Sequence, residues 1–457
     1  MGIYSAFTRN VTLPIYDLVR DTSRFRYGRI LQRTQWFPRK KLLELQNQNL
    51  RLLIKHAYDT VPYYHRVMKQ NRVLPQDIQG VEDLTKIPVL TKDDVRANSA
   101  DLVSLGFPVK QLVPYRSGGS GDQLQFFVTK DQLSWEIAAE YRAYGWANYK
   151  LGDKCFMFWA SPIDLSRYKS LQKRLSAKLE RIFVVDTYII SNAVLAKYAS
   201  LLEAWRPKIV KGYASSIYLM AKYLVDKGIS SVRPEAVITT AETLFSSMRE
   251  TIEEAFGCEV FSFYGSREIG GLASECEKHS GFHISVENVA MEFIKDSEQV
   301  APGETGVIFL TSLRNYGMPL IRYRLGDVGM PSDKVCDCGR GLPLMSSIEG
   351  RVSDFMAVYD KKRGKVVPVG PIYPLIIYGL MKVPLRSVRV VQNEVNRLDI
   401  KAVKDHGYSR KDTEYLISQL KGALGDDIQI NFEFLDYLPP LPSGKRSTFI
   451  SKLKVFE

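Results

Sequence analysis

The sequence predicts an α/β protein with a large N-terminal body of several subdomains and a small α+β domain at the C-terminal end. Strands and helices alternate from about residue 130 to about residue 266, which is typical of helices packed on a largely parallel sheet. Strands separated by Gly and Pro turns follow, and the last part of the chain has another element order. The length of 457 residues exceeds what one hydrophobic core usually holds, so length also favours several units.

The N-terminal part, residues 1 to 60, is predicted to be a basic helical segment. Residues 1 to 55 contain 11 Lys or Arg and 3 Asp or Glu, within a chain of net charge +13. Its aromatic residues include Tyr4, Phe7, Tyr16 and Trp36. Such a segment can contact an anionic membrane surface, a polyanionic substrate or another part of the protein. The cations follow no known pattern for reading nucleic acid, so we expect no nucleic-acid partner.

Local signals mark the elements of the body. Apolar residues recur at helical spacing from about Lys41 to Met68, and Pro62 is expected to end or kink that helix. Thr91, followed by two aspartates, is typical of a helix N-cap. The later expected helices are 130–148, a stretch ending at 178, one ending near 205, 216–227 and one ending at 256, and the expected strands are 154–160, 181–188, 208–214, 235–242 and 258–265.

The character of the sequence changes near Ala290. The runs "AMEFI", "TGVIFLTSL" and "PLIRYRLGDVG" have no helices between them and predict an antiparallel sheet or a barrel-like segment. From Ser353 a new unit is expected, with strands "VRVVQ" and "RLDIKAVK", a helix from Arg410 to Leu424 and a final strand "IQINFEFL". We therefore assign residues 1–352 to the body and residues 353–457 to the small domain.

The composition excludes several classes of protein. No run of about 18 apolar residues appears, and the stretch "MGIYSAFTRN" lacks the charged and then apolar pattern of a secretory signal. Five cysteines in this length make no disulfide framework, which suits a reducing compartment. We expect a cytoplasmic protein, with peripheral association at the inner membrane surface left open by the basic segment.

A glycine-rich stretch, "YRSGGSGDQLQFF" from Tyr115 to Phe127, precedes an apolar run. Glycines permit backbone conformations in which N–H groups wrap phosphate oxygens, and the hydroxyls of Ser117 and Ser120 can add donors. The stretch is neither a Walker loop nor a GxGxxG motif, and Asp122 stands where a phosphate loop usually offers lysine. Taken alone, it is either a turn or a phosphate-binding loop.

Four further stretches follow it in order. They are "FYGSREIGG" (Phe263 to Gly271), "IRYRLGDVG" (Ile321 to Gly329), "IEGRVSDF" (Ile348 to Phe355) and "PPLPSGKRS" (Pro439 to Ser447). The ordered set of five resembles the core motifs of adenylate-forming enzymes, specifically the phenylacetate-coenzyme A ligase family and its branch associated with capsular polysaccharide biosynthesis. The resemblance covers nearly the whole chain. It implies the adenylate-forming enzyme fold, a C-terminal domain that moves as a lid, and the homodimers found among family members.

The resemblance and the side-chain chemistry together suggest roles. Glu268 is expected to coordinate the Mg²⁺ that bridges ATP phosphates, and Ser266 to bind a phosphate or carboxylate oxygen. Lys445, carried by domain motion, is expected to stabilise the α-phosphoryl transition state. The expected ATP-binding residues are Ser117, Gly118, Gly119, Ser120, Gly121, Glu242, Tyr264, Gly265, Asp327 and Arg351, and the expected acyl pocket includes Tyr213, Ala214 and Gly270.

Each of these residues has a plainer alternative when taken alone. Tyr264, which could stack on adenine, follows a strand where a turn is common. Asp327 could accept both ribose hydroxyls through its two oxygens, or be a turn aspartate. Arg351 could lie over ribose and phosphate, or form a surface salt bridge. Lys445 alone would be an exposed loop lysine.

Cysteine and histidine gather in two short stretches, "CEKHSGFH" and "CDCGRG". We select Cys276, His283, Cys336 and Cys338 as the ligands of a tetrahedral zinc site, with His279 as the substitute for His283. The resemblance implies a structural zinc rather than a catalytic one, because several relatives bear a similar cluster, and no water-activating carboxylate lies at an evident spacing. Reduced buried thiols are the alternative.

Two departures from the family pattern affect the functional prediction. Asp122 interrupts the phosphate loop, and after Arg351 the usual paired acidic hinge is reduced because Ser353 replaces the first acid. We predict an ATP-dependent ligase that forms an acyl-AMP from a small-molecule carboxylate and transfers the acyl group, with coenzyme A as first choice of acceptor. The alternatives are an amine or hydroxyl acceptor on a sugar or amino acid in capsular or exopolysaccharide biosynthesis, and a non-catalytic scaffold that retains the fold.

Overall fold

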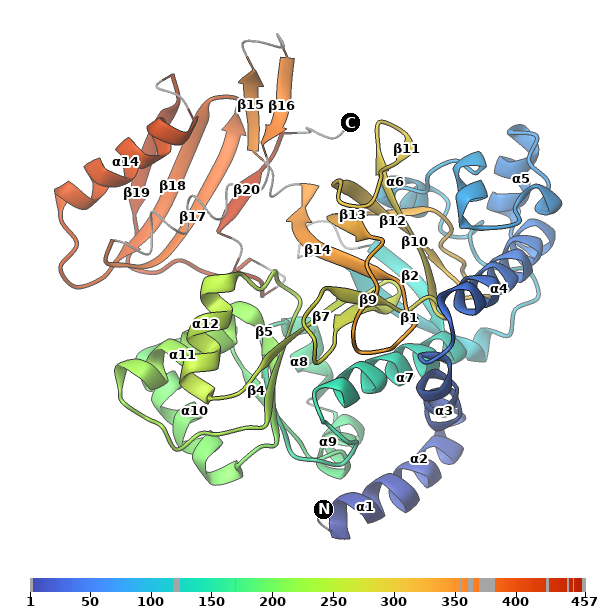
Figure 1. Cartoon of the computed structure of the whole chain (residues 1–457), viewed down its shortest axis with the longest axis horizontal. Coiled ribbons are helices and arrows are strands. Elements are labelled where there is room, and N and C mark those ends of the chain that lie inside the picture. The colour runs from blue at the N-terminus through green and yellow to red at the C-terminus, as the bar shows by residue number, and fades with distance from the viewer. Residues whose placement is uncertain are drawn as a thin grey trace. The chain divides into compact units, whose positions relative to one another are not determined.

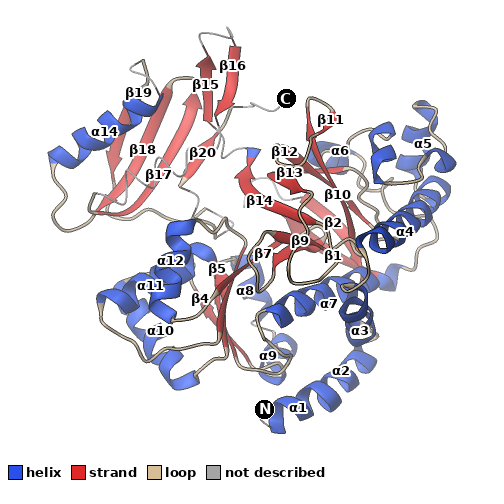
Figure 2. Ribbon diagram, in the orientation of Figure 1, coloured by secondary structure: helices blue, strands red, loops and turns tan. Residues whose placement is uncertain are grey.

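The computed structural model describes residues 3–117, 124–168, 170–352, 356–360, 365–369, 383–424, 427–441, 444–446 and 448–453. The chain divides into two compact units. The first comprises Met1–Leu325, Gly329–Ser347 and Pro442–Gly444, and the second comprises Gly326–Val328, Ile348–Leu441 and Lys445–Glu457. Figure 1 follows the chain through its elements, and Figure 2 marks the helices and strands.

Helices form the N-terminal part of the first unit. They are α1 (Ile3–Phe7), a π-helical turn (Thr8–Thr12), α2 (Leu13–Arg20), α3 (Arg24–Thr34), α4 (Arg39–Thr60) and α5 (Pro62–Gln70). The helical pattern from Lys41 to Met68 is divided between α4 and α5, because Pro62 lies in the first turn of α5, where its missing N–H costs no hydrogen bond.

Short helical elements lead from α5 to the first strand. They are 3₁₀ turns at Pro75–Asp77, Val81–Lys86 and Val109–Gln111, and helix α6 (Lys92–Ala97). The predicted N-cap of α6 is confirmed, since the Thr91 hydroxyl accepts the backbone N–H of Asp94 at 3.1 Å. A separate antiparallel hairpin follows, formed by β1 (Leu112–Ser117) and β2 (Leu124–Thr129).

A twelve-stranded sheet is the framework of the first unit, in the order β11-β10-β12-β13-β14-β9-β8-β7-β6-β5-β3-β4. Its parallel strands are β3 (Cys155–Trp159), β4 (Ile182–Asp186), β5 (Ile209–Tyr213), β6 (Ala236–Thr240) and β7 (Val260–Ser266). The other strands are β8 (Gly270–Glu275), β9 (Phe282–Ile284), β10 (Val289–Lys295), β11 (Glu298–Gln299), β12 (Gly306–Ser312), β13 (Tyr323–Ser332) and β14 (Leu344–Arg351). Pairing becomes antiparallel between β7 and β8, so the strand-rich segment continues the α/β sheet.

Helices cover both faces of the parallel part. They are α7 (Lys130–Trp146), α8 (Pro162–Tyr168), α9 (Leu171–Leu179), α10 (Asn192–Trp205), α11 (Ala214–Asp226) and α12 (Ser246–Phe256). Side chains alternate between the faces: Phe156 and Phe158 of β3 pack with α10, α11 and α12, whereas Cys155 packs with the C-terminal part of α7. On its other side α7 contacts α3 through Trp135 and Leu31. Helix α7 is therefore held between the sheet and the N-terminal helices.

The second unit contains a four-stranded sheet in the order β19-β18-β17-β20 and the hairpin β15-β16. The strands are β15 (Met356–Asp360), β16 (Lys365–Val369), β17 (Leu385–Glu394), β18 (Arg397–Lys404), β19 (Gln429–Phe434) and β20 (Phe449–Ser451). Helix α14 spans Arg410–Leu424, the range predicted, and contributes Leu420 to a core with Val390 and Ile400. None of the helices that the structure describes has the length and apolar character needed to span a lipid bilayer.

Candidate active site and candidate metal centre

Three of the sequence motifs meet at the carboxylate of Glu268, in the turn between β7 and β8. The hydroxyl of Ser117, at the end of β1, donates to Glu268 Oε1 at 2.6 Å, and the hydroxyl of Tyr323, in β13, lies 3.4 Å from the same oxygen. Gln132 Nε2 donates to the Glu268 backbone carbonyl at 3.1 Å. Glu268 is 5% exposed and makes no ion pair within the described ranges. A buried carboxylate contacted by neutral donors is a suitable ligand for a divalent cation.

The glycine-rich loop begins and ends beside this carboxylate. Ser117 and Leu124 are paired across β1 and β2, so the intervening residues connect two adjacent strand ends. The predicted phosphate-binding residues Gly118, Gly119, Ser120 and Gly121, together with Asp122, lie outside the described residues. Their expected roles stay predictions, whereas the position of Ser117 is established.

The β7–β8 hairpin contains the other residues of the motif "FYGSREIGG". Tyr264 is buried in β7. A Cβ on Gly265 would lie 2.9 Å from the Gly270 carbonyl oxygen, so no side chain fits at that position. Ser266 Oγ accepts the N–H of Ile269 at 3.2 Å, which leaves its O–H able to donate to a ligand.

The expected adenine-side and acyl-pocket segments lie next to each other at the carboxyl ends of β5 and β6, where Tyr213 pairs with Thr240. Glu242 Oε2 accepts the N–H of Ser215 at 2.9 Å, in the first turn of α11, which begins at Ala214. A carboxylate is favourable at a helix N-terminus. Tyr213 packs edge-on against Trp159 with ring centroids 5.1 Å apart. This edge of a parallel sheet is where α/β proteins usually bind ligands.

An ion pair that the sequence analysis did not identify anchors the Glu268 turn. Arg267 contacts Asp164 through two hydrogen bonds of 2.9 and 2.6 Å, and Trp159 Nε1 donates to Asp164 at 3.0 Å. Burial opposes the ionisation of Asp164, but the hydrogen bonds and charge of Arg267 outweigh it and lower the pKa of Asp164. The two residues are 103 positions apart, and neither periodicity nor spacing connects them.

Two carboxylates on one face of α7 also escaped the sequence analysis. Glu140 accepts hydrogen bonds from Lys211 Nζ and Tyr144. Burial raises the pKa of Glu140, but Lys211 outweighs this effect and the net shift is downward. Glu136 packs directly on Gly270, where a Cβ would lie 2.3 Å from Glu136 Cγ, and it accepts from Gln132 Nε2 at 2.6 Å. Burial raises the pKa of Glu136 to about 8. Glu136 therefore places a largely protonated carboxyl beside the expected acyl pocket.

The motifs "IRYRLGDVG" and "IEGRVSDF" contact each other in the second unit. Arg351 Nε lies 3.4 Å from Asp327 Oδ1, with Asp327 mostly buried and the Arg351 side chain 50% exposed. Lys445 lies in the loop between β19 and β20 of the same unit, and its carbonyl accepts the N–H of Leu441 at 2.8 Å. The Lys445 side chain is half-buried.

The four selected metal ligands come together in the first unit. The ligand atoms of Cys276, His283, Cys336 and Cys338 all lie within 4.8 Å of one another. Cys276 Sγ is 3.6 Å from Cys336 Sγ, and Cys338 Sγ is 3.3 Å from His283 Nε2. Two thiols from one turn therefore face the thiol of Cys276, directly after β8, and the imidazole of His283 in β9.

The surroundings of this Cys3His cluster fit a zinc ion. The N–H groups of Lys278 and Arg340 each donate to a cluster sulfur at 3.4 Å, an arrangement that stabilises thiolates. His283 Nδ1 lies 3.3 Å from the Leu342 carbonyl, so Nε2 is the ring nitrogen available to a metal ion. Burial lowers the pKa of His283 to about 4, so its ring is neutral.

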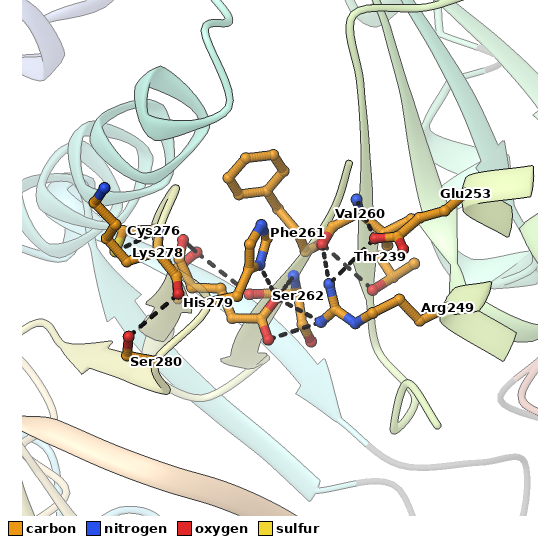
Figure 3. A network of polar contacts seen from close by, with 12 residues as sticks. Thr239, Arg249, Glu253, Val260, Phe261, Ser262, Cys276, Lys278, His279 and Ser280 are labelled. Atoms are coloured by element: carbon orange, nitrogen blue, oxygen red, sulfur yellow. Dashed lines mark hydrogen bonds and ion pairs between the residues drawn. The ribbon is translucent and has the colours of Figure 1, made fainter. Parts of the chain in front are cut away.

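His279 lies in a different set of contacts, drawn in Figure 3. Its Nδ1 is 3.4 Å from Glu275 Oε2, and its ring centroid is 4.8 Å from that of Phe261. Glu275 also accepts two hydrogen bonds from Arg249 at 2.7 and 2.8 Å. The structure thus places His283 at the Cys3His cluster and His279 beside Glu275.

Comparisons with known proteins agree with this architecture. A family model described as the CapK C-terminal domain matches residues 361–452. Protein CapK of Staphylococcus aureus is 25% identical over 418 residues, which cover 90% of each chain. Phenylacetate-coenzyme A ligase of Thermus thermophilus is 27% identical over 330 residues, 70% of this chain and 73% of that protein. A solved 2-hydroxyisobutyryl-CoA ligase in complex with R3-HIB-AMP has a TM-score of 0.72 and 18% identity, covering 93% of this chain and 92% of that chain.

The chain therefore has the adenylate-forming enzyme fold, and its relatives and structural neighbours include coenzyme A ligases. In sequence it is similar to the phenylacetate-coenzyme A ligases and to CapK, as the ordered motifs predicted. The predicted fold class, a large α/β body with a small C-terminal α+β domain, is also confirmed.

Proposed function

We propose that this protein activates a small-molecule carboxylate with ATP. The carboxylate attacks the α-phosphorus, pyrophosphate leaves, and an acyl-AMP forms. The observation that carries the proposal is the convergence of Ser117, Glu268 and Tyr323, because it joins the ends of the glycine-rich loop to a buried carboxylate without a cationic partner in the described chain. Phosphoryl transfer depends mainly on positioning and on charge stabilisation, which such a site can provide.

The remaining site residues have matching roles in this proposal. Glu268 would hold Mg²⁺, which supplies charge neutralisation on the ATP phosphates. Asp327 would accept the ribose hydroxyls, with Arg351 holding its carboxylate in place. Lys445 would bring a positive charge to the transferred phosphoryl group. Tyr264 and Glu242 would line the adenine side, and Tyr213 and Gly270 the acyl side.

For the second step we propose coenzyme A as the first choice of acceptor, by analogy with the similar phenylacetate-coenzyme A and 2-hydroxyisobutyryl-CoA ligases. One observation favours an amine or hydroxyl acceptor instead. The similarity to the T. thermophilus ligase covers 70% of the chain, whereas that to CapK covers 90%, and the CapK domain model matches residues 361–452. A C-terminal domain of another type is consistent with another acceptor, such as a sugar or amino acid in capsular or exopolysaccharide biosynthesis.

We also propose that the Cys3His cluster binds a structural Zn²⁺. The ion would join the β8–β9 connection to the chain before β14, and thus stabilise the hairpin that contains Glu268. Its ligand set of three thiolates and one imidazole is complete, which leaves no position for a reactive water. We place the enzyme in the cytoplasm, where ATP and reducing conditions are available.

ATP–pyrophosphate exchange with purified full-length protein tests the first step. A panel of aryl, hydroxy, amino and aliphatic acids should contain at least one that supports exchange. Thioester formation with coenzyme A, compared with amide or ester formation on amino acids and sugars, then identifies the acceptor. If no acid supports exchange and calorimetry detects no binding of ATP with Mg²⁺, the protein is a non-catalytic scaffold.

A further inference from the structure

The N-terminal helical segment carries an apolar stripe on its exposed side. Within residues 3–20, Tyr4 is 53% exposed, Phe7 56%, Val11 39%, Ile15 56% and Leu18 82%. These residues follow one another at intervals of three or four positions, the spacing that places side chains on one face of a helix. We call these five residues the N-terminal stripe.

The buried side chains described in residues 3–20 are polar. Thr8 is 2% exposed and Asp17 is 5% exposed. Asp17 Oδ1 lies 2.5 Å from Arg24 Nε, and Arg24 also pairs with Glu180 at 3.3 Å. A surface helix of a globular protein normally buries its apolar side and exposes its polar side. Here the polar contacts hold the segment against the body, and the apolar side is presented outward.

Helix α9 also exposes large apolar side chains. Leu171 is 81% exposed and Leu175 is 56% exposed, one turn apart on α9. The residues directly after α9 contact the N-terminal segment, since Glu180 pairs with Arg24 and the Arg181 guanidinium lies 5.0 Å from the centre of the Tyr4 ring. Figure 1 shows α9 near α1 and α2. Two neighbouring elements thus expose large apolar side chains.

The exposed charges of the N-terminal helices are mostly positive. Within residues 3–41, seven cations are exposed, Arg20, Arg26, Arg29, Arg33, Arg39, Lys40 and Lys41, while Asp21 is the one exposed acid of that range. Arg174 and Lys178 of α9 are exposed as well. A second copy of the chain would present the same positive charge, so electrostatic repulsion opposes self-association through this face. Exposed apolar residues in a part of the chain with an excess of exposed cations complement an anionic lipid surface.

We propose that the N-terminal stripe and its flanking cations dock the protein on an anionic lipid bilayer. The segment lies in the plane of the interface, with the stripe among the acyl chains nearest the headgroups and the arginines at the lipid phosphates. Docking does not require the chain to cross the bilayer. It also does not depend on the proposed acyl activation, because neither the stripe nor its cations belong to the site around Glu268.

Vesicle co-sedimentation of the full-length protein tests this inference. Vesicles with about one third phosphatidylglycerol in phosphatidylcholine should retain the protein at low salt, pure phosphatidylcholine should retain much less, and about 0.5 M salt should release it by screening the charges. The double variant Ile15→Ser with Leu18→Ser should lower the partition coefficient about tenfold or more. Leu105→Ser, which alters a residue 69% exposed elsewhere in the first unit, is the matched control and should bind as the wild type does.

Three results would overturn the proposal. The wild type could remain in the supernatant with anionic vesicles, or the double variant could bind them as well as Leu105→Ser does. Light scattering after size-exclusion chromatography could instead show that the wild type self-associates and that the double variant is monomeric, which would assign the stripe to a second copy. Because Ile15 and Leu18 are exposed, the variants should keep the wild-type melting temperature, and that measurement excludes misfolding as the cause.

Discussion

Ser117 and Glu268, 151 positions apart in the sequence, share a hydrogen bond of 2.6 Å between the serine hydroxyl and the buried carboxylate. The bond fixes the start of the glycine-rich loop to the turn between the parallel and antiparallel parts of the sheet. Any phosphate bound by that loop would therefore lie close to the carboxylate that we assign to Mg²⁺. This relationship makes the two residues the first targets for mutation.

Glu268→Gln should abolish most of the acyl activation while preserving the fold. The amide oxygen can still accept from Ser117 and Tyr323, but the negative charge is lost, so we expect ATP–pyrophosphate exchange to fall about a hundredfold or more. Unchanged exchange in Glu268→Gln at wild-type melting temperature would exclude Glu268 as the metal ligand.

Ser117→Ala removes one hydrogen bond to a charged group and should lower kcat/KM for ATP about tenfold.

Lys445→Ala should lower the rate of exchange about a hundredfold, because one positive charge is removed from the developing transition state. Lys452→Ala is the matched control, since Lys452 is exposed in the same unit just after β20. The affinity for ATP, measured by calorimetry, should change little in Lys445→Ala if the lysine acts mainly in the transition state. Equal losses in both variants would indicate a general effect of charge and not a role for Lys445.

The sequence predicted the elements wherever local chemistry defines them. Pro62 divides a long helical pattern, the side chain of Thr91 caps the N-terminus of α6, and α14 covers the predicted range from Arg410 to Leu424. These features depend on neighbours within one or two turns, which the sequence displays directly. The junction at which the antiparallel strands join the parallel sheet depends on pairing between residues far apart in the sequence. For this reason the sequence alone predicted either an antiparallel sheet or a barrel-like segment there.

The candidate site was predictable as a set of motifs but not as a set of contacts. Asp164 and Arg267 are far apart in sequence, and Glu136 and Glu140, spaced one turn apart, resemble the charged face of an ordinary surface helix. The choice between His279 and His283 was open because both follow Cys276 at a workable distance. Pairing of His283 with Leu344 across β9 and β14 favours His283, since that register brings it next to the Cys338 turn.

The Cys3His cluster should contain one zinc ion per chain, measured by elemental analysis of protein purified without added metal. His283→Ala should lose the zinc and lower the melting temperature by about 5 °C or more, because a structural metal contributes folding free energy directly. His279→Ala should retain the zinc, since His279 contacts Glu275 and Phe261. Loss of zinc in His279→Ala alone would assign the fourth ligand to the other histidine.

Glu136 should make the stability of the fold decrease as the pH rises toward 9. Burial raises the pKa of Glu136 from the ordinary 4.5 to about 8, so the folded state binds this proton more tightly than the unfolded state does. Its contribution to stability is fully present below pH 4.5 and is lost as the pH rises to about 8, because over that range the unfolded state releases the proton that the folded state keeps. Glu136→Gln keeps the shape of the side chain but cannot ionise. Its melting temperature should therefore exceed that of the wild type by an amount that grows between pH 6 and pH 9.

Glu433→Gln, on an exposed side chain of β19, is the control and should show no such widening. A constant gap for Glu136→Gln across that range would mean that Glu136 ionises freely and is not desolvated by its packing on Gly270.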